Sequence, residues 1–217
     1  MATIEGFRVQ NFRALRDVAL GKLSGEQAGE PLTPFTVVIG KNGVGKSTLF
    51  DAFGFVADCL ATDVETACDM KQRGGFERMR SKSVTEPIRF EIYYREAQNE
   101  YPITYELAID LDANGRPFVL SEMLRQHRKN QKYDRPYPFL RLERGKGSVW
   151  AGEEAIGDSE EDSASSPVEI TDPHELGIST LGTLKEHPLL EPDRNVSPSF
   201  GKFRDGLRRL VMMEDDL

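Results

Sequence analysis

The residues most clearly arranged for chemistry form the segment Gly40-Lys41-Asn42-Gly43-Val44-Gly45-Lys46-Ser47. This segment matches the phosphate-binding pattern G-x-x-x-x-G-K-[ST] at every fixed position. Glycines let successive backbone N–H groups turn toward a phosphate, and a helix that starts near Lys46 would point its positive end at the same place. In such a loop the lysine reaches the β- and γ-phosphates and the Ser47 hydroxyl holds Mg²⁺. The pattern predicts a site for ATP and Mg²⁺ with Lys46 as the catalytic residue. The expected nucleotide-binding residues are Gly40, Lys41, Asn42, Gly43, Val44, Gly45, Lys46, Ser47 and Thr48.

The sequence on either side of this loop predicts the elements that would hold it. Residues 35–39 are rich in β-branched side chains, which is typical of a short strand buried on both faces. After the loop, apolar residues recur at helical spacing, which predicts a helix with one face toward the core. The residues of that face are Leu49, Phe53, Val56 and Leu60.

The rest of the chain changes in character along its length. Residues 4–9 and 18–20 predict two short strands, and alternating apolar residues in 88–94, 103–111 and 118–120 predict an antiparallel meander with a turn at Asn114-Gly115. Helical spacing returns in residues 200–210. Cys59 and Cys68 lie in a helical region with no other cysteine, so we interpret them as packing residues rather than metal ligands.

Two segments together resemble a known family. Residues 10–18 read QNFRALRDV, and residues 36–49 read TVVIGKNGVGKSTL. They resemble the N-terminus of ABC-type ATPases of the SMC and RecF branch, and most closely the bacterial AAA group near RecF and the OLD nucleases. The resemblance implies an α/β fold: the head lobe of a P-loop NTPase, with a mostly antiparallel sheet after the P-loop helix and a C-terminal helix. It also implies that Arg13 approaches the nucleotide, and that two heads pair as a homodimer or hetero-oligomer.

The same family pattern requires parts that are not found here in their expected order. Leu23-Ser24-Gly25-Glu26-Gln27 is similar to the signature segment but precedes the phosphate loop, and Leu210 to Asp215 is similar to a Walker B strand but has its acids reversed. We therefore expect hydrolysis to need a C-terminal half or a partner chain, so that ATPase activity by this chain alone stays an open question. By the resemblance, the role would be in DNA repair or phage defence, with a nuclease or effector as a partner. The alternatives are a self-sufficient P-loop phosphotransferase and a nucleotide-sensing adaptor without turnover.

The charge of the chain is unevenly distributed. The net charge is −8, yet nine acidic residues and no Lys or Arg lie between residues 147 and 184, so the remainder is close to neutral. Residues 123–146 carry a net charge of +6, with aromatic residues interleaved, which suits contact with a nucleic-acid backbone and its bases or, equally, a solvated hairpin face. A smaller basic cluster surrounds Gly74-Gly75. The candidate DNA contacts in the larger segment are Arg125, Arg128, Lys129, Lys132 and Arg135.

Composition sets the expected organisation and compartment. We expect an ATP-binding lobe in residues 1–150, an acidic flexible linker in 151–173 and a helical segment in 174–217. No apolar run reaches the roughly 18 residues that cross a bilayer, and two cysteines in 217 residues favour a reducing compartment. The expectation is a cytoplasmic protein without a membrane partner.

Overall fold

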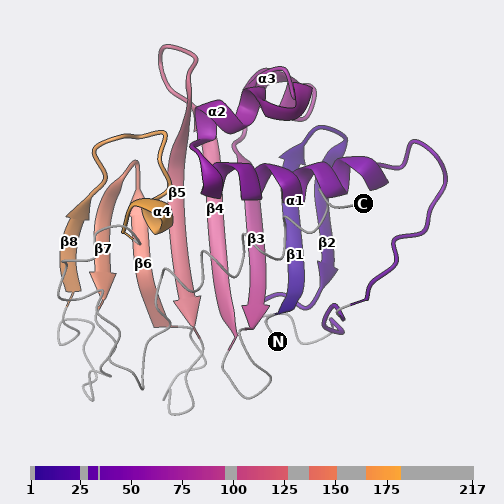
Figure 1. Cartoon of the computed structure of the whole chain (residues 1–217), viewed down its shortest axis with the longest axis horizontal. Helices are drawn as coiled ribbons and strands as arrows, with labels where there is room; N and C mark the ends of the chain where they lie inside the picture. Colours follow the sequence, from indigo (N-terminus) through magenta and orange to yellow (C-terminus); the bar gives the residue numbers. More distant parts are fainter. Residues whose placement is uncertain are drawn as a thin grey trace.

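The fold is built on one eight-stranded antiparallel sheet, seen in a computed structural model that describes residues 3–24, 29–33, 35–95, 102–126, 137–150 and 165–181. The strand order is β2-β1-β3-β4-β5-β6-β7-β8, so nearly every strand pairs with its neighbour in sequence (Figure 1). Antiparallel neighbours of this kind need only short connections. The strands are β1 (Thr3–Phe12), β2 (Leu15–Gly21), β3 (Ile88–Arg95), β4 (Ile103–Leu111), β5 (Pro117–Gln126), β6 (Tyr137–Glu143), β7 (Lys146–Trp150) and β8 (Ser165–Glu169).

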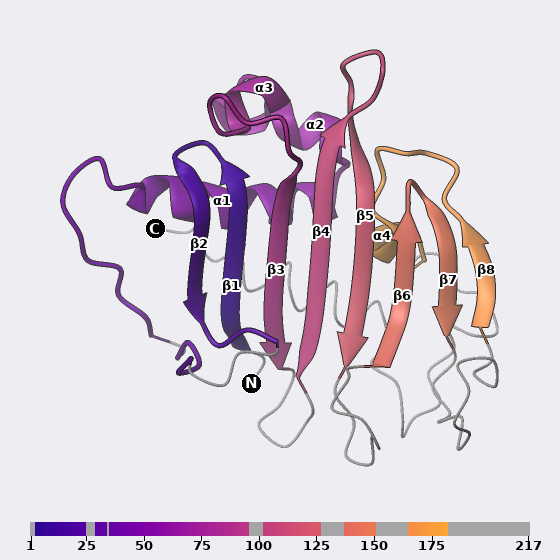
Figure 2. The ribbon, with the colours of Figure 1, turned by 180° about the vertical axis from the view of Figure 1, so that it is seen from behind.

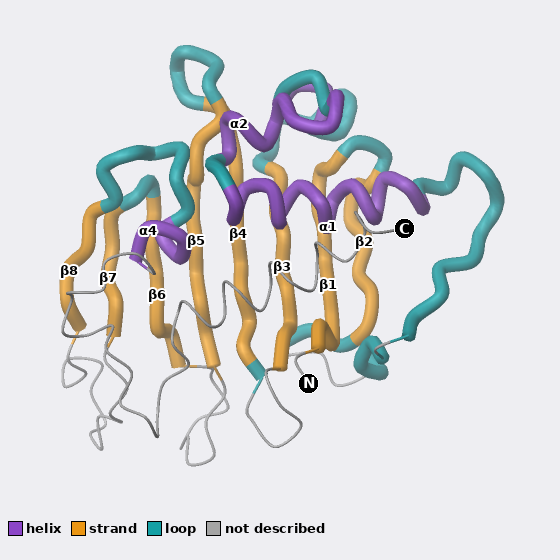
Figure 3. Tube along the Cα trace, in the orientation of Figure 1, coloured by secondary structure: helices purple, strands orange, loops and turns teal. Residues whose placement is uncertain are grey.

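The described helices lie on one face of this sheet. In Figure 3 the longest helix, α1, crosses β1 to β4, and Figure 2 shows the opposite face with no helix in front of it. Alternation of apolar and polar residues along the strands produces this two-sided arrangement, because successive side chains point to opposite faces. The helices are α1 (Lys46–Ala61), α2 (Val64–Asp69), α3 (Phe76–Met79), α4 (Gly177–Leu181) and the 3₁₀ turn η1 (Met70–Gln72).

Aromatic rings form the contact between α1 and the sheet. Phe53 of α1 stacks on Phe7 of β1, with ring centroids 3.8 Å apart, and Phe55 packs against Phe12 and Phe90 at 6.0 and 5.8 Å. Burying rings of this size is a large favourable term in the free energy of folding. The contact fixes the rotation of α1 about its own axis, and therefore the direction in which its first turn faces.

Most strands and the helix expected from the sequence are confirmed. The apolar alternation in residues 88–94 and 103–111 lies in β3 and β4, and Asn114-Gly115 is the turn before β5, with Asp112 Oδ1 accepting from the Asn114 N–H at 2.8 Å. Cys59 and Cys68 are buried packing residues, and burial raises the pKa of the Cys59 thiol well above its ordinary value. The stripe in residues 200–210 lies outside the described residues.

The prediction of a buried strand immediately before the phosphate loop is wrong. Residues 35–40 form neither a helix nor a strand and pair with no strand among the described residues, and Phe35 and Ile39 are 84% and 90% exposed. The segment runs outside β2 before it reaches α1 (Figure 1). A β-branched run gains its burial only from neighbouring strands, and the sheet of the described residues closes at β2 without it.

The expected acidic linker is also different in part. Residues 165–169 were expected to belong to it, yet they form edge strand β8, antiparallel to β7. Lys146 of β7 and Glu169 of β8 form an ion pair at 2.8 Å across this edge. The acidic composition of the region predicts a flexible linker, but an edge strand also tolerates charged residues and proline, so composition does not distinguish the two. Residues 151–164 lie outside the described residues.

The segment that follows β8 is fastened to the sheet through a buried carboxylate. Glu122 of β5 is 1% exposed and accepts hydrogen bonds from the Tyr105 hydroxyl at 2.9 Å and from the backbone N–H groups of Gly177 and Ile178 at 2.6 and 3.1 Å. Nearby, His174 is buried, and its Nδ1 lies 2.6 Å from the Pro117 carbonyl oxygen. Glu122 thus anchors the start of α4.

Among the described residues, no helix is both long and apolar enough for a membrane crossing.

The burial of Glu122 predicts a pH-dependent contribution to stability. Desolvation raises its pKa from 4.5 to about 7, against the opposing effect of the three hydrogen bonds. Because the folded chain holds this proton more tightly than the unfolded chain, the contribution is fully present below pH 4.5 and is lost as pH rises through about 7. Glu122→Gln removes this pH-dependent contribution, because an amide does not titrate in this range. We expect the free energy of unfolding of the wild type, relative to the variant, to fall by about 2 kcal/mol between pH 5.5 and pH 8 in denaturant titrations. A pH-independent difference would contradict the assignment.

Candidate nucleotide site

The loop from Gly40 to Gly45 is closed by the lysine that follows it. Lys46 Nζ donates to the carbonyls of Gly40 and Lys41 at 2.7 and 2.9 Å. Gly43 and Gly45 have φ angles of 83° and 99°, in the left-handed region where glycine carries little cost. The loop is therefore curved around the lysine side chain, and its binding of phosphate stays a prediction.

The first turn of α1 offers free donors to an anion. Gly45 is the N-cap residue and makes no side-chain capping bond, and the first turn contains no acidic residue. The first N–H groups of a helix have no partners within the helix, and its positive dipole end favours negative charge. Together with Lys46 and the Ser47 hydroxyl, this arrangement fits the phosphates and Mg²⁺ of a nucleotide.

Strand β2 fixes the distance between the loop and the sheet. A Cβ placed on Gly45 would lie 3.0 Å from Leu15 Cδ2, so the loop approaches the buried Leu15 side chain closely. The Gly45 backbone thus rests on the first residue of β2. This contact brings the β1–β2 turn, which contains Arg13, to the same end of α1.

Arg13 is held in that turn by its backbone and by one carboxylate. Its φ is 50°, a left-handed conformation that is uncommon outside glycine. The Arg13 N–H donates to the Met79 carbonyl at 2.6 Å, and its carbonyl accepts from Ser81 Oγ at 2.8 Å. Its guanidinium Nη2 lies 3.2 Å from Asp51 Oδ2 on α1. The expectation that Arg13 contacts nucleotide stays a prediction, and the structure adds Asp51 as its partner.

Asp51 belongs to a chain of alternating charges along α1. Arg73 lies between Asp51 and Asp58, at 2.9 and 2.6 Å, and Lys71 lies 3.5 Å from Asp58. The Arg73 side chain is fully buried, with its guanidinium 5.4 Å from the centre of the Phe55 ring. It also approaches Gly54, where a Cβ would lie 3.5 Å from Nη2. Arg73 is therefore a structural part of the core rather than a surface cation for nucleic acid.

Sequence reasoning missed this arrangement for a physical reason. In the sequence, Arg73 belongs to the basic cluster around Gly74-Gly75. Asp51 and Asp58 belong to the predicted helix that contains the apolar stripe. Two acids seven residues apart lie close to one face of a helix, and that spacing is the signal that could have indicated a shared cation. Which arginine would join them depends on the path of residues 70–75.

The basic segment gives little support for nucleic-acid contact within the described residues. Arg125 is partly buried on β5 and forms an ion pair with Glu106 of β4. The other candidates, Arg128, Lys129, Lys132 and Arg135, lie outside the described residues. Nucleic-acid contact by this segment stays a prediction.

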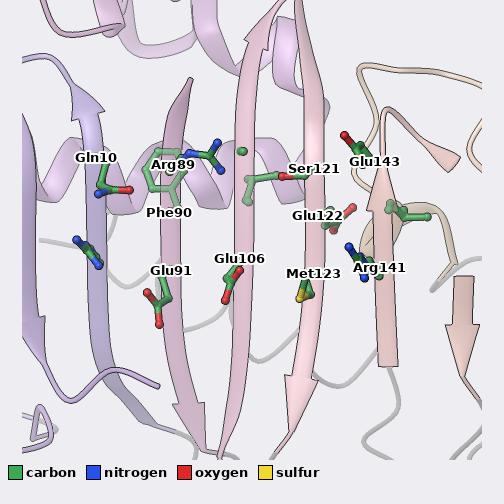
Figure 4. Close-up of a pocket in the computed structure, with 14 residues that line it drawn as sticks. Gln10, Arg89, Phe90, Glu91, Glu106, Ser121, Glu122, Met123, Arg141 and Glu143 are labelled. Atoms are coloured by element: carbon green, nitrogen blue, oxygen red, sulfur yellow. The ribbon is translucent and has the colours of Figure 1, made fainter. Parts of the chain in front are cut away.

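The helix-free face of the sheet contains a shallow hollow of mixed charge. In Figure 4, Arg89 and Arg141 lie on this face together with Glu91, Glu106 and Glu143. A surface that binds a polyphosphate backbone concentrates one sign of charge. The alternation of arginine and glutamate here does not have that character.

The comparisons with known proteins identify a family. A family model described as "AAA domain, putative AbiEii toxin, Type IV TA system" matches residues 35–175, more than half of the chain. The chain belongs to this family. The match indicates a P-loop AAA ATPase domain of the α/β class, and such domains generally use ATP with Mg²⁺. No curated protein and no solved structure matches. The AAA match begins at Phe35, so it includes the whole phosphate loop, α1 and the strands from β3 to β8, whereas β1 and β2 lie before it.

The buried position of Arg73 gives a prediction for stability. Arg73→Ala would leave Asp51 and Asp58 partly buried with fewer cations, and breaking a buried pair costs roughly 3–5 kcal/mol of unfolding free energy. The matched control is Arg116→Ala, which removes an arginine from an exposed pair with Glu65 and should cost much less, because solvent screens that pair. Chemical denaturation of both variants measures the difference. Equal losses would show that Arg73 does not support α1.

Proposed function

We propose that the chain is the ATP-binding N-terminal lobe of an ABC-type ATPase of the SMC/RecF-like group, which binds ATP·Mg²⁺ through Gly40 to Thr48. The observation that supports this most strongly is the loop that closes around Lys46 at the uncapped start of α1. A curved glycine loop, a free helix N-terminus and an adjacent Lys-Ser pair are the combination that a polyphosphate requires.

The residues of the loop divide the binding between them. Backbone N–H groups of residues 43–46 would surround the phosphates, and the Lys46 ammonium would exchange its two carbonyl acceptors for phosphate oxygens. The Ser47 hydroxyl would hold Mg²⁺, whose charge offsets that of the phosphates. The loop thus supplies positioning and positive charge, which are the main contributions of a protein to phosphoryl transfer.

The apolar surface beside the loop supports the need for a completing partner. The large exposed hydrophobic residues of the described chain all lie in residues 35–50: Phe35, Val37, Ile39, Val44 and Phe50. A concentration of exposed apolar side chains of this kind marks a surface that another polypeptide covers. A segment that pairs with no strand among the described residues can also gain a partner by strand addition. In this proposal the covering polypeptide brings the signature and Walker B segments, and paired heads enclose the nucleotide.

The biological setting that we propose is defence against phage or DNA repair. The description of the matching family names a toxin of a toxin–antitoxin system, which favours the defence role. ATP binding and head pairing would then control a nuclease or other effector partner, with DNA as the substrate of the assembly.

The first test of this proposal is nucleotide affinity. Lys46→Ala removes the ammonium that faces the phosphates, and we expect the affinity for ATP·Mg²⁺, measured by isothermal titration calorimetry, to fall at least about tenfold. The control is Lys82→Ala, an exposed lysine in the loop after α3, which should bind as the wild type does. Equal affinity in the wild type and Lys46→Ala would end the assignment.

The second test concerns turnover. We expect the chain alone to hydrolyse ATP at close to background rate, and a polypeptide carrying the signature and Walker B segments to raise that rate. Ile39→Gln should weaken this rise without changing the melting temperature of the chain, because Ile39 is 90% exposed. Full activity of the chain alone, or γ-phosphate transfer to a small acceptor, would instead favour a self-sufficient phosphotransferase.

A further inference from the structure

The five charged residues along α1 form a linear chain whose two ends are cations. The order is Arg13, Asp51, Arg73, Asp58 and Lys71, and each neighbouring pair is within 3.5 Å. The Arg73 side chain in the middle is fully buried, whereas Arg13 is 35% exposed. We propose that Asp51 binds the Arg13 guanidinium when no nucleotide is present and competes for it with the phosphates of bound ATP. This inference rests on the proposed nucleotide site.

The balance of charges among these five residues allows Arg13 to leave Asp51. Three cations face two carboxylates, so the group carries one surplus positive charge while Arg13 is present. Without the Arg13 guanidinium, Arg73 and Lys71 still balance Asp51 and Asp58. The departure therefore leaves no unpaired buried charge, which is the outcome that normally makes breaking a buried ion pair costly.

The position of Asp51 on α1 puts Arg13 within reach of the phosphates. Asp51 follows Ser47 by four residues, so the two side chains lie on the same face of the helix with about 5–6 Å between their Cβ atoms. The contact between Gly45 and Leu15 independently places the β1–β2 turn against the loop. A guanidinium on Asp51 is thus about one helical turn from the Mg²⁺ ligand proposed above.

The Arg13 contacts separate a fixed backbone from a side chain with spare capacity. Hydrogen bonds to Met79 and Ser81 hold the backbone, so binding would require only side-chain rotation. Arg13 Nε is buried and makes no hydrogen bond within the described part of the chain. A phosphate offers acceptors that a guanidinium can contact with two N–H groups at once, whereas Asp51 shares its carboxylate with Arg73. The exchange would therefore satisfy more of the Arg13 donors.

A double-mutant cycle on ATP·Mg²⁺ affinity tests the competition. Arg13→Gln should weaken binding by about tenfold, because a charge-assisted contact to phosphate is lost. Asp51→Asn should strengthen binding by about threefold to tenfold, because Arg13 is released while Arg73 keeps Asp58. In the Arg13→Gln background, Asp51→Asn should have no effect. A merely structural role for Asp51 would instead change affinity to the same extent in both backgrounds, and that result would overturn the inference.

Two controls match the variants in their local environments. Arg144→Gln also replaces an arginine with a left-handed φ in a hairpin turn, and Asp110→Asn also removes a partly buried carboxylate paired with an arginine. Both are expected to leave ATP affinity unchanged. If the wild type itself shows no binding, the proposed function fails, and this inference fails with it. Binding by the wild type with no coupling in the cycle refutes the inference alone.

A measurement on the unsubstituted protein avoids any dependence on folding of the variants. The ¹⁵Nε–H resonance of Arg13 should shift when ATP·Mg²⁺ is added, since Nε would gain an acceptor, and the shift should be absent in Lys46→Ala. An unchanged resonance in a wild-type protein that binds ATP would overturn the proposal.

Discussion

The packing of α1 across β1 and β3 is the interaction on which the remaining features depend. Stacking of Phe53 on Phe7, and of Phe55 among Phe12 and Phe90, fixes both the height and the rotation of the helix. Because α1 begins at Lys46, the same contact determines where the phosphate loop points. The apolar face of the helix lies on the sheet, and its flank carries Asp51 and Asp58 toward the turn at residues 70–75. Position of the loop and position of the charges are thus two results of one packing event.

The charged chain beside α1 is unusual because its centre is the most buried part. A buried arginine between two carboxylates gains attraction but loses the hydration of three ions, so such groups are weak evidence for stability by themselves. Their value here is geometric, since Arg73 contacts the helix, the Phe55 ring and the Ala67 carbonyl at once. These contacts hold residues 70–75 against α1. Met79 and Ser81, which follow shortly after, bind the backbone of Arg13. The turn that contains Arg13 is thus linked to α1 through residues far apart in sequence.

The phosphate loop has internal hydrogen bonds, whereas the segment before it has exposed apolar side chains. The loop is curved and closed on Lys46, whereas the segment that leads into it exposes Phe35 and Ile39 to solvent. An isolated extended segment gains little stability, because strands are stabilised by neighbours on both sides. The exposed segment is the surface that we propose a second polypeptide covers, and the antiparallel sheet supports α1.

The sequence alone determined the local features, because these depend on residues close together in the chain. The pattern from Gly40 to Ser47 has fixed positions within eight residues, and the helical stripe beginning at Leu49 and the alternation in residues 88–94 and 103–111 each have a period that short-range geometry imposes. Only the tertiary structure decided that the segment 35–39 is largely exposed, that residues 165–169 form a strand, and which partners Arg13 and Arg73 have. A β-branched run needs neighbouring strands before it is buried, and a charge needs a specific opposite charge before it can leave water. Both conditions involve residues distant in the chain, so the periodicity of any one segment contains no information about them.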